Sequence, residues 1–258
     1  MFLRRIGNKH GIANQIYKHF LPHTCYLENF FGAGGLFFNK PLAKYNILND
    51  INSDVFNCFN VTIQNGDKLI DLIETAPYSQ ELFNKFRDEP APQDPFLKAL
   101  RFLFLSNYSY LGGGETLKFG SESHKKRLIL KIKEFLKSDY IEHSQFTNCD
   151  FRKFIQKICF SKKKKYFLYS DPPYFGTENN YNEDLSWMKW KEQDVVDLFE
   201  SNIASGLKFA ISEFDHPFIL ETAKKYNLNI INICERQNLK NRANEILITN
   251  YETNNTLF

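Results

Sequence analysis

The chain has 258 residues, of which 43% are hydrophobic and 24% are charged, so it can bury one good core with room for a smaller inserted domain. The net charge of +3 is mildly basic, which permits a nucleic-acid partner without demanding one. No apolar run approaches a membrane span and no long apolar stretch follows the first residues, so we expect neither a membrane protein nor a signal peptide.

Cysteine and histidine are too scattered to build a metal site. The five cysteines form no C-x-x-C pair, and such an odd, dispersed set favours reduced thiols in a cytosol-like compartment. His19 and His23 are four residues apart, but Pro22 interrupts any helical face that they would share. We therefore expect no metal.

A basic segment with two glycines opens the chain. Gly7 and Gly11 permit a tight backbone, and Lys9 between them can pair with a carboxylate. A flexible basic N-terminus is the alternative interpretation. A helix is predicted over 12–20, and Pro22 ends it.

A strand, a glycine-rich turn and a helix are predicted next. The strand covers 24–30, the turn covers 31–35, and an apolar run from Leu36 opens the helix. Glycines let a ligand approach the backbone, while N–H groups at a helix N-terminus face its polar atoms. The second strand, 45–50, ends in Asp50, where an acid can accept both hydroxyls of a ribose. These features indicate a nucleotide-binding unit; Asp50 as a helix N-cap is the alternative.

From Val55 the apolar pattern is helical for roughly 80 residues and is interrupted by prolines. Asp94-Pro95 predicts an N-cap followed by proline at the first helical position. Residues 106–120 are predicted to form a loop or hairpin rich in glycine and aromatic residues. An amphipathic helix is predicted over 122–137, and its cationic face suits phosphate contacts. A solvated helix face is the alternative.

Two further strand ends carry an acid and an aromatic residue. A strand over 140–146 precedes Asp150-Phe151 and a short helix over 152–158. A buried strand over 166–169 is stopped by Asp171-Pro-Pro-Tyr174, because neither proline can donate a ladder hydrogen bond. This stiff tetrapeptide presents a carboxylate, a carbonyl and an aromatic face where open α/β sheets bind ligands. It suits a flat ring with an amino group; a strand-ending turn with a packed tyrosine is the alternative.

The remainder completes an α/β alternation. A loop with two tryptophans is predicted over 175–190, and a polar loop over 236–244. The regular elements predicted in this part are helix 191–203, strand 207–212, helix 217–225, strand 228–234 and strand 246–251.

Several of these groups, taken in order, resemble the motifs of the Dam-type (D12 class, alpha-order) DNA adenine N6-methyltransferases. Gly7-Asn-Lys9 resembles G-G-K, Glu28-Asn-Phe-Phe-Gly-Ala-Gly34 resembles E-P-F-x-G-x-G, Asp50-Ile-Asn52 matches D-I-N, Asp150-Phe151 matches D-F, and Asp171-Pro-Pro-Tyr174 matches D-P-P-Y. The resemblance covers nearly the whole chain. It departs from the family pattern at Asn8 for glycine, Asn29 for proline and Arg5 for tryptophan, and the R-Y-N…F-N pattern of GATC-reading members is absent.

The resemblance implies an α/β fold, in which a Rossmann-like S-adenosylmethionine-dependent methyltransferase sheet carries an inserted, mainly helical target-recognition domain. The catalytic domain is then 1–54 with 145–258, and the insert is 55–144. It further implies S-adenosyl-L-methionine as cofactor, double-stranded DNA as partner, and a cytoplasmic enzyme of a bacterium or a phage. A cognate restriction endonuclease is a further expected partner for members in restriction-modification systems.

The resemblance also assigns roles to residues. Asp171 and the Pro172 carbonyl accept hydrogen bonds from adenine N6, beside Pro173, and Tyr174 stacks on the flipped base. The cofactor-binding residues that it implies are Arg5, Gly7, Lys9, Glu28, Phe30, Gly32, Gly34, Asp50, Ile51, Asp150, Phe151 and Asp171. The expected DNA-binding residues are Tyr108, Tyr110, Lys118, Lys125, Lys126 and Arg127.

Two alternatives stay open. An RNA or protein-glutamine methyltransferase can also carry an N/D-P-P-Y tetrapeptide, but the long helical stretch between the two halves favours duplex DNA. A catalytically inactive DNA-binding relative is the second alternative, and the intact Asp50, Asp171 and Tyr174 argue against it.

Overall fold

The computed structural model describes residues 1–5, 7–118, 122–158, 160–161, 165–177, 190–237 and 242–253. Most of the predicted loop 175–190, including Trp187, lies outside these residues, as does Cys159. Within them, no helix is both long enough and apolar enough to span a bilayer.

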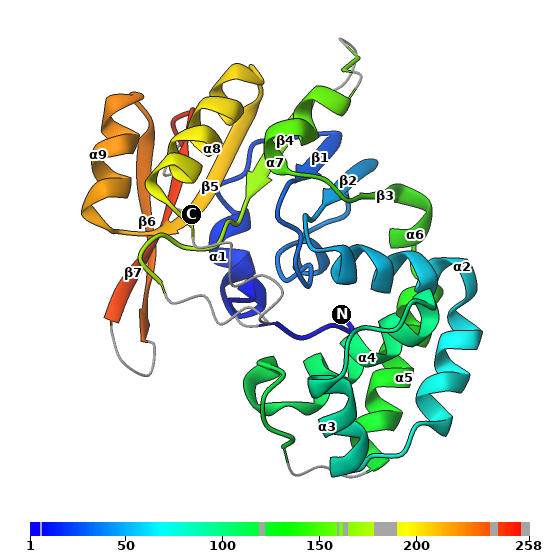
Figure 1. Cartoon of the computed structure of the whole chain (residues 1–258). Coiled ribbons are helices and arrows are strands. Elements are labelled where there is room, and N and C mark those ends of the chain that lie inside the picture. The colour runs from blue at the N-terminus through cyan, green and yellow to red at the C-terminus, as the bar shows by residue number, and fades with distance from the viewer. Residues whose placement is uncertain are drawn as a thin grey trace.

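The described strands form one mixed sheet (Figure 1). They are β1 (Cys25–Glu28), β2 (Tyr45–Asn49), β3 (Ser144–Thr147), β4 (Tyr166–Ser170), β5 (Lys208–Phe214), β6 (Asn229–Gln237) and β7 (Arg242–Thr249). Their order is β3-β2-β1-β4-β5-β7-β6. β7 runs antiparallel to β5 and β6, whereas the other neighbouring pairs are parallel. This confirms the predicted Rossmann-like α/β sheet.

The central strands are buried because parallel strands are covered on both faces. Every residue of β1 is buried, as are Phe167 to Ser170 of β4. β1 lies between β2 and β4, so the connections leave this point in opposite directions along the sheet. In open α/β sheets, ligands bind at the C-terminal ends of the strands at such a switch point.

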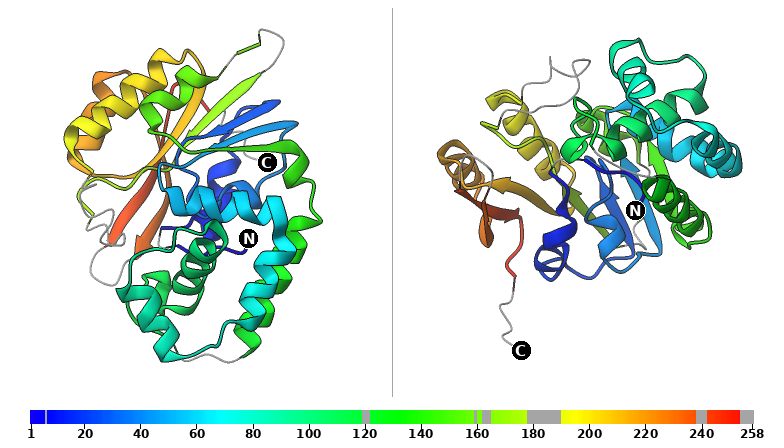
Figure 2. Two further views of the ribbon diagram at one scale, coloured as in Figure 1. Left: turned by 45° about the vertical axis from the view of Figure 1, so that its right-hand side comes forward. Right: turned by 90° about the horizontal axis from the view of Figure 1, so that it is seen from below.

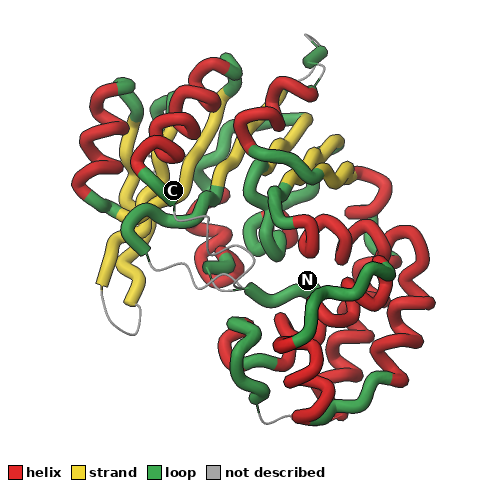
Figure 3. Tube along the Cα trace, in the orientation of Figure 1, coloured by secondary structure: helices red, strands yellow, loops and turns green. Residues whose placement is uncertain are grey.

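Helices cover the sheet and fill the long connection between β2 and β3 (Figure 3). The α-helices are α1 (Ala13–Tyr17), α2 (Ser53–Thr75), α3 (Gln80–Asp88), α4 (Pro95–Tyr108), α5 (Glu122–Leu136), α6 (Tyr140–His143), α7 (Phe151–Phe154), α8 (Glu192–Ala204) and α9 (Pro217–Lys225). Single 3-10 turns are η1 (Lys9–Ile12), η2 (Phe37–Asn39), η3 (Tyr110–Gly112) and η4 (Ile155–Lys157). The predicted division at 55–144 remains a prediction.

Helix α2 connects the sheet to the other helices of the connection. The Asn52 side chain caps it by accepting hydrogen bonds from the N–H groups of Asp54 and Val55. The helix is kinked at Asn65, which has non-helical dihedral angles. A side chain at the neighbouring Gly66 would collide with Leu136 of α5. Glycine therefore permits the close packing of α2 on α5 that both views in Figure 2 show.

An aromatic cluster joins these helices to the sheet. The Phe59 ring of α2 is fully buried. Its centroid lies 5.0 Å from that of Phe2, 5.1 Å from Phe31 and 5.0 Å from Phe146. The Phe135 ring of α5 lies 5.9 Å away. The N-terminal segment, the glycine turn, β3 and two helices thus share one core.

Two predictions around the glycine turn and β3 are wrong. The expected helix from Leu36 is only the 3-10 turn η2, because the backbone is extended at Lys40 and Pro41 follows. The glycine turn therefore lacks the helix N-terminus that was expected beside it. The predicted strand 140–146 is helical over Tyr140–His143, where the Tyr140 ring packs on Phe37 at 5.1 Å; only Ser144–Thr147 pairs with β2.

Two loop boundaries are also corrected. The predicted loop 106–120 starts later, since α4 continues to Tyr108. The predicted polar loop 236–244 is largely a hairpin, in which Arg236 pairs with Ala243. Cross-strand pairing extends β6 and β7 beyond the apolar runs from which the ends of these strands were predicted.

We predict that Phe59→Ala lowers the free energy of unfolding by about 3–5 kcal/mol, because the change leaves a cavity among four rings. Urea denaturation followed by circular dichroism measures this. The matched control is Leu130→Ala on α5, whose side chain is 55% exposed and whose loss should cost less than about 1 kcal/mol. Equal costs for the two variants would contradict the description of Phe59 as the centre of the cluster.

Candidate active site

The site lies at the C-terminal ends of β1 and β4, the neighbouring strands at the switch point (Figure 1). Glu28 of β1 pairs in register with Tyr169 of β4, so the residues that follow the two strands emerge side by side. Asp171-Pro-Pro-Tyr174 follows β4, and the turn that contains Gly32 follows β1. The predicted position of the tetrapeptide after a buried strand is confirmed.

Lys9 reaches this site from the N-terminal segment. Asn8 caps η1 by accepting a hydrogen bond from the backbone N–H of His10 at 2.8 Å, which fixes the start of the turn. The Lys9 side chain is only 3% exposed, and its Nζ lies 2.6 Å from Oδ1 of Asp171. Nζ also donates to the carbonyl of Gly7 at 3.2 Å. The prediction that Lys9 pairs with a carboxylate is confirmed.

A second pair of charges adjoins this ion pair, and sequence reasoning missed both members. Glu245 of β7 is fully buried; its Oε1 accepts a hydrogen bond from the Tyr174 hydroxyl and lies 3.8 Å from Nζ of Lys9. Arg236 of β6 places Nη1 3.3 Å from Oε2 of Glu245. The signal in the sequence was an acid placed directly before the apolar run Ile246-Leu-Ile248, where a strand is buried.

Three contacts fix the Tyr174 ring. Its hydroxyl donates to Glu245, and its ring meets the Phe214 ring edge-on with centroids 4.6 Å apart. Nζ of Lys9 lies 4.5 Å from the ring centroid, within the range of a cation–π interaction. The side chain is buried, so the predicted aromatic face belongs to a ring that is enclosed by these contacts.

Burial changes the acid–base properties of the carboxylates here. It raises the pKa of Asp171, while the adjacent ammonium of Lys9 opposes that rise. Burial also raises the pKa of Glu213, at the end of β5, to about 8. Glu213 accepts hydrogen bonds from the backbone N–H groups of Phe175 and Phe214, each at 3.0 Å. It thereby holds the chain on both sides of the Tyr174–Phe214 contact, and sequence reasoning missed it too.

Asp50 fastens the glycine turn to the end of β2. Its Oδ2 accepts a hydrogen bond from the N–H of Gly32 at 2.6 Å, and its Oδ1 accepts from the N–H of Asn52 at 2.8 Å. Asn52 rather than Asp50 is the N-cap of α2, so the N-cap alternative for Asp50 is wrong. Each oxygen retains a further lone pair with which it can accept a hydrogen bond.

The glycines of the turn serve different purposes. Gly32 has a φ of 54°, and an added Cβ would meet no atom within 4 Å, so the space beside this backbone is open. Gly34 has a φ of 72° and is enclosed by the rings of Phe31 and Phe38. A Cβ at Gly35 would collide with the Asn8 side chain. The residue that departs from the G-G-K pattern thus packs directly against the glycine turn.

Three aromatic rings gather beside the turn. Phe30 lies 5.3 Å from Phe151 and 5.7 Å from Trp190, and the rings of Phe151 and Trp190 are also 5.7 Å apart. The Trp190 indole N–H is buried and has no hydrogen-bond partner among the described residues. The structure therefore brings Phe30 and Phe151 together, as expected, and adds a donor that the sequence did not single out.

Asp150 begins α7 by accepting a hydrogen bond from the N–H of Arg152 at 2.8 Å. The Arg152 guanidinium lies 3.2 Å from Asp150 and 2.6 Å from both Asp194 and Asp197 of α8. This cluster holds α7 against the start of α8, beside Trp190.

The other expected cofactor residues have varied surroundings. Glu28 is buried and accepts a hydrogen bond from the Tyr26 hydroxyl at 2.8 Å. Burial raises the pKa of Glu28 to about 8. Arg5 and Ile51 are half-buried, and the Ile51 carbonyl accepts a hydrogen bond from Asn148. Gly7 is exposed with a φ of 84°.

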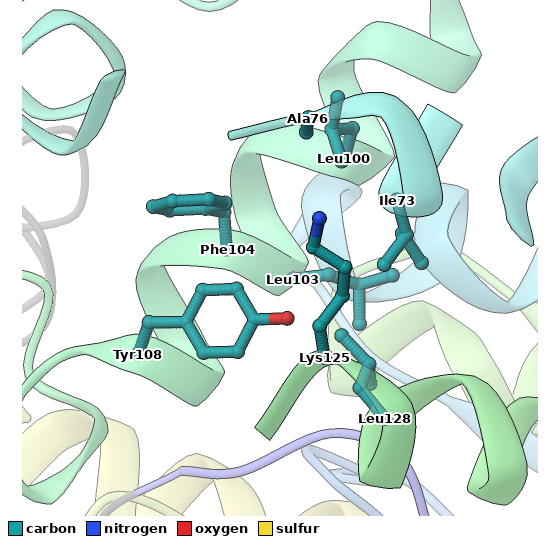
Figure 4. Close-up of a pocket in the computed structure, with 8 residues that line it drawn as sticks. All are labelled: Ile73, Ala76, Leu100, Leu103, Phe104, Tyr108, Lys125 and Leu128. Atoms are coloured by element: carbon teal, nitrogen blue, oxygen red, sulfur yellow. The ribbon is translucent and has the colours of Figure 1, made fainter. Parts of the chain in front are cut away.

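Two of the six expected DNA-contacting side chains are buried. Tyr108 and Lys125 line a cavity of about 10 Å³, the size of one water, between α2, α4 and α5 (Figure 4). Nζ of Lys125 donates to the Glu74 carbonyl at 3.0 Å. The cavity is otherwise lined by Ile73, Ala76, Leu100, Leu103, Phe104 and Leu128. Both side chains thus contribute to helix packing.

The other four are accessible. Tyr110 is 66% exposed, Lys126 and Arg127 are exposed, and Lys118 is half-buried. Partial burial lowers the pKa of both Lys118 and Lys131, and the positive charges of Arg4 and Arg127 lower it further. We call Arg4, Lys118, Arg127 and Lys131 the cationic cluster; its members repel one another.

The described residues contain no group of three or more potential metal ligands. Cys58, Cys149 and Cys234 form no disulfide with one another, and the Cys149 thiol donates a hydrogen bond to Oδ1 of Asn49.

We predict that Glu213→Gln flattens the pH dependence of stability. The folded pKa of about 8 lies above the ordinary 4.5, so Glu213 contributes stability that is complete below about pH 4.5 and is lost as pH rises through 8. Between these values the free energy of unfolding should fall about 1.4 kcal/mol less per pH unit in the variant. Urea denaturation at several pH values measures the slope, and equal slopes would contradict a protonated Glu213.

Sequence comparison finds several relatives of this chain. The DNA adenine methylase of Escherichia coli is 34% identical over 116 residues, which cover 43% of this chain and 41% of that protein. The DNA adenine methylase of Salmonella typhi is 25% identical over 248 residues, which cover 90% of this chain and 87% of that protein. A type II methyltransferase of Lactococcus lactis subsp. cremoris is 24% identical over 269 residues, which cover 91% of this chain and 92% of that protein.

The crystal structure of a dimethyladenosine transferase from Plasmodium falciparum matches 96% of this chain and 62% of that one, with 12% identity and a TM-score of 0.38, too low to carry an argument. The family model of the D12 class N6 adenine-specific DNA methyltransferases, in contrast, matches residues 6–243 and so spans all five motifs. The chain belongs to the D12 class N6 adenine-specific DNA methyltransferase family.

Proposed function

We propose that this chain transfers a methyl group from S-adenosyl-L-methionine to N6 of an adenine flipped out of double-stranded DNA. The observation that carries the proposal is the Asp171 carboxylate at the switch point, held through Oδ1 by Lys9 and set beside the buried Tyr174 ring. Membership of the family, and the names of relatives that align over most of the chain, support the same reaction.

The residues around the glycine turn fit such a cofactor. The open space beside Gly32 admits a ligand to the backbone, and both Asp50 oxygens retain acceptor capacity for ribose hydroxyls. The aromatic group of Phe30, Phe151 and Trp190 suits a flat purine, and the unpartnered Trp190 N–H suits a ring nitrogen that accepts. When bound, the cofactor supplies a methyl group on a positively charged sulfur.

Asp171 and Pro172 perform the central task of the proposed reaction. Adenine N6 is a poor nucleophile because its lone pair is delocalised into the ring. The Asp171 carboxylate and the Pro172 carbonyl would each accept a hydrogen bond from the amino group, which localises the lone pair. The same two acceptors offset the positive charge that develops on N6 as its lone pair forms the new N–C bond. The S–C bond would break with its electron pair remaining on sulfur, and N6 would then lose a proton to solvent. Because Lys9 contacts Oδ1 of Asp171, the other oxygen, Oδ2, can accept the hydrogen bond from the adenine amino group.

Tyr174 would receive the flipped base. The base must leave the duplex to reach Asp171, because its amino group is otherwise paired inside the stack. An aromatic face next to the two acceptors repays part of the cost of unstacking. The contacts of Tyr174 with Glu245, Phe214 and Lys9 support this role, since they hold the ring in one orientation.

The helical segment 55–144 is the proposed target-recognition domain, with the cationic cluster and exposed Lys126 meeting phosphates. The positive charges of Arg4 and Arg127 act on both Lys118 and Lys131, and a bound polyanion would offset this repulsion. The exposed Tyr110, on the loop after α4, would contribute to sequence choice rather than general affinity. Tyr108 and Lys125 support this domain from within.

The similarity to a type II methyltransferase extends the proposal to modification of DNA that a cognate endonuclease would otherwise cut. The named relatives are bacterial, so we expect the enzyme to work in a bacterial cytoplasm.

One experiment tests the function directly. The purified chain is incubated with tritiated S-adenosylmethionine and unmethylated plasmid DNA, and the DNA is digested to nucleosides. We expect label in N6-methyladenine, while RNA and protein substrates remain unlabelled. Label in 5-methylcytosine, in RNA alone, or in no nucleoside would overturn the proposal.

We predict that Asp171→Asn slows single-turnover methylation at least about 10²-fold, because the carboxylate interacts most strongly with the charge of the transition state. Calorimetry should show cofactor affinity largely unchanged. The matched control is Asp67→Asn at an exposed position of α2, which should methylate at the parental rate. An Asp171→Asn variant as fast as the parent would remove Asp171 from the mechanism.

We predict that replacing Lys126 and Arg127 by glutamine flattens the salt dependence of DNA binding. The log–log slope should decrease by roughly 0.9 for each of the two residues that meets a phosphate. Fluorescence anisotropy at several salt concentrations measures the slope. Lys224 and Lys225 are exposed on α9, which lies at the opposite end of the sheet from α5 (Figure 1), so the control pair Lys224→Gln with Lys225→Gln should keep the parental slope. If the two pairs of substitutions change the salt slope equally, Lys126 and Arg127 do not contact phosphates and this face of α5 is only solvated.

A further inference from the structure

Glu245 is a buried carboxylate next to the proposed catalytic tetrapeptide but outside all five motifs. It lies in β7, between β5 and β6, and pairs with Phe214 on one side and Cys234 on the other. Its backbone is therefore held by two strands. Phe214, its neighbour in β5, is the residue whose ring packs on Tyr174.

Both oxygens of Glu245 have defined partners. Oε1 accepts the Tyr174 hydroxyl and lies 3.8 Å from Nζ of Lys9. Oε2 lies 3.3 Å from Nη1 of Arg236. The Glu245 carboxylate thus contacts the Tyr174 hydroxyl and also Lys9, the residue that pairs with Asp171.

Stability alone does not explain an acid at this position. A buried carboxylate is costly to desolvate, and a hydrophobic residue of similar volume often stabilises a core equally well or better. The neighbouring positions of β7, from Ile246 to Ile248, are buried aliphatic residues. The contacts of Glu245 lead instead to the two groups that the proposed reaction uses.

We propose that Glu245 is a positioning residue, which holds the Tyr174 ring for stacking on the flipped adenine and shares Lys9 with Asp171; this inference rests on the proposed function. A free Tyr174 hydroxyl would let the ring reorient about its side-chain bonds. A ring held by Glu245 at its hydroxyl and by Phe214 at its edge has lost that freedom before the base arrives.

Two substitutions perturb this hydrogen bond from opposite ends, since one removes the donor and the other removes the charge of the acceptor. Tyr174→Phe keeps the ring and removes the hydroxyl. Glu245→Gln keeps the volume, but its amide has one acceptor oxygen where the carboxylate has two, so it cannot accept from both Tyr174 and Arg236. The double variant completes a thermodynamic cycle.

The chain offers a matched control. The Tyr226 hydroxyl, directly after α9, donates to Oε1 of Glu200 in α8 at 2.7 Å, and neither residue is one that the proposed reaction uses. Tyr226→Phe and Glu200→Gln make the same chemical changes in a tyrosine–glutamate pair that the proposal does not use.

The test first maps the methylated adenine and then places 2-aminopurine at that position of a duplex. Fluorescence reports flipping, and single-turnover transfer to the unmodified duplex reports chemistry. We expect Tyr174→Phe and Glu245→Gln each to reduce the flipping equilibrium and the transfer rate by about ten-fold, the effect of one strong hydrogen bond. The double variant should be no worse than the worse single variant, and the control pair should match the parent.

Other results overturn the inference. If Glu245→Gln flips the base and transfers the methyl group as the parent does, Glu245 has no positioning role. The same holds if the only change in this variant is a lower melting temperature. Additive losses in the double variant would show that Glu245 does not act through Tyr174. If Glu245→Gln does not fold, parental flipping by Tyr174→Phe still refutes the inference. If the parent protein makes no N6-methyladenine, the proposed function fails instead, so the two failures are distinguishable.

Discussion

The ion pair between Lys9 and Asp171 is the constraint on which the site depends. Both side chains are largely buried, and either charge alone would be costly to remove from water. The pair therefore fixes the N-terminal segment at the C-terminal end of β4. The same segment is held by α4, since the N–H of Arg4 donates to Ser106 at 3.1 Å and Asn107 donates to the Phe2 carbonyl at 3.1 Å.

Around this pair, charges of opposite sign alternate from Arg236 through Glu245 and Lys9 to Asp171. The four groups come from β6, β7, the N-terminal segment and the end of β4. The antiparallel hairpin at the sheet edge thus supports a site that is built at the switch point of the parallel strands. Satisfied networks of this kind are rigid, because each member would be expensive to leave without a partner.

The helices between β2 and β3 are not mechanically independent of the site. α2 begins three residues after Asp50, which holds the glycine turn, and it packs on α4 and α5. α4 in turn binds the N-terminal segment that carries Lys9. The Phe59 cluster joins the same elements through apolar contacts. The proposed DNA-contacting surface and the proposed catalytic residues therefore share one packed framework.

The sequence alone determined most strands, most helices and the position of the tetrapeptide, because apolar periodicity and proline act locally. It also indicated that Lys9 could pair with a carboxylate. Only the tertiary structure decided which one, because Lys9 and Asp171 lie far apart in the chain and meet through strand order. Local pattern could not show that Glu245 and Arg236 face Tyr174, or that Lys125 turns inward to the Glu74 carbonyl. Burial of a charge is decided by the partners that the fold supplies, and these lie on other elements.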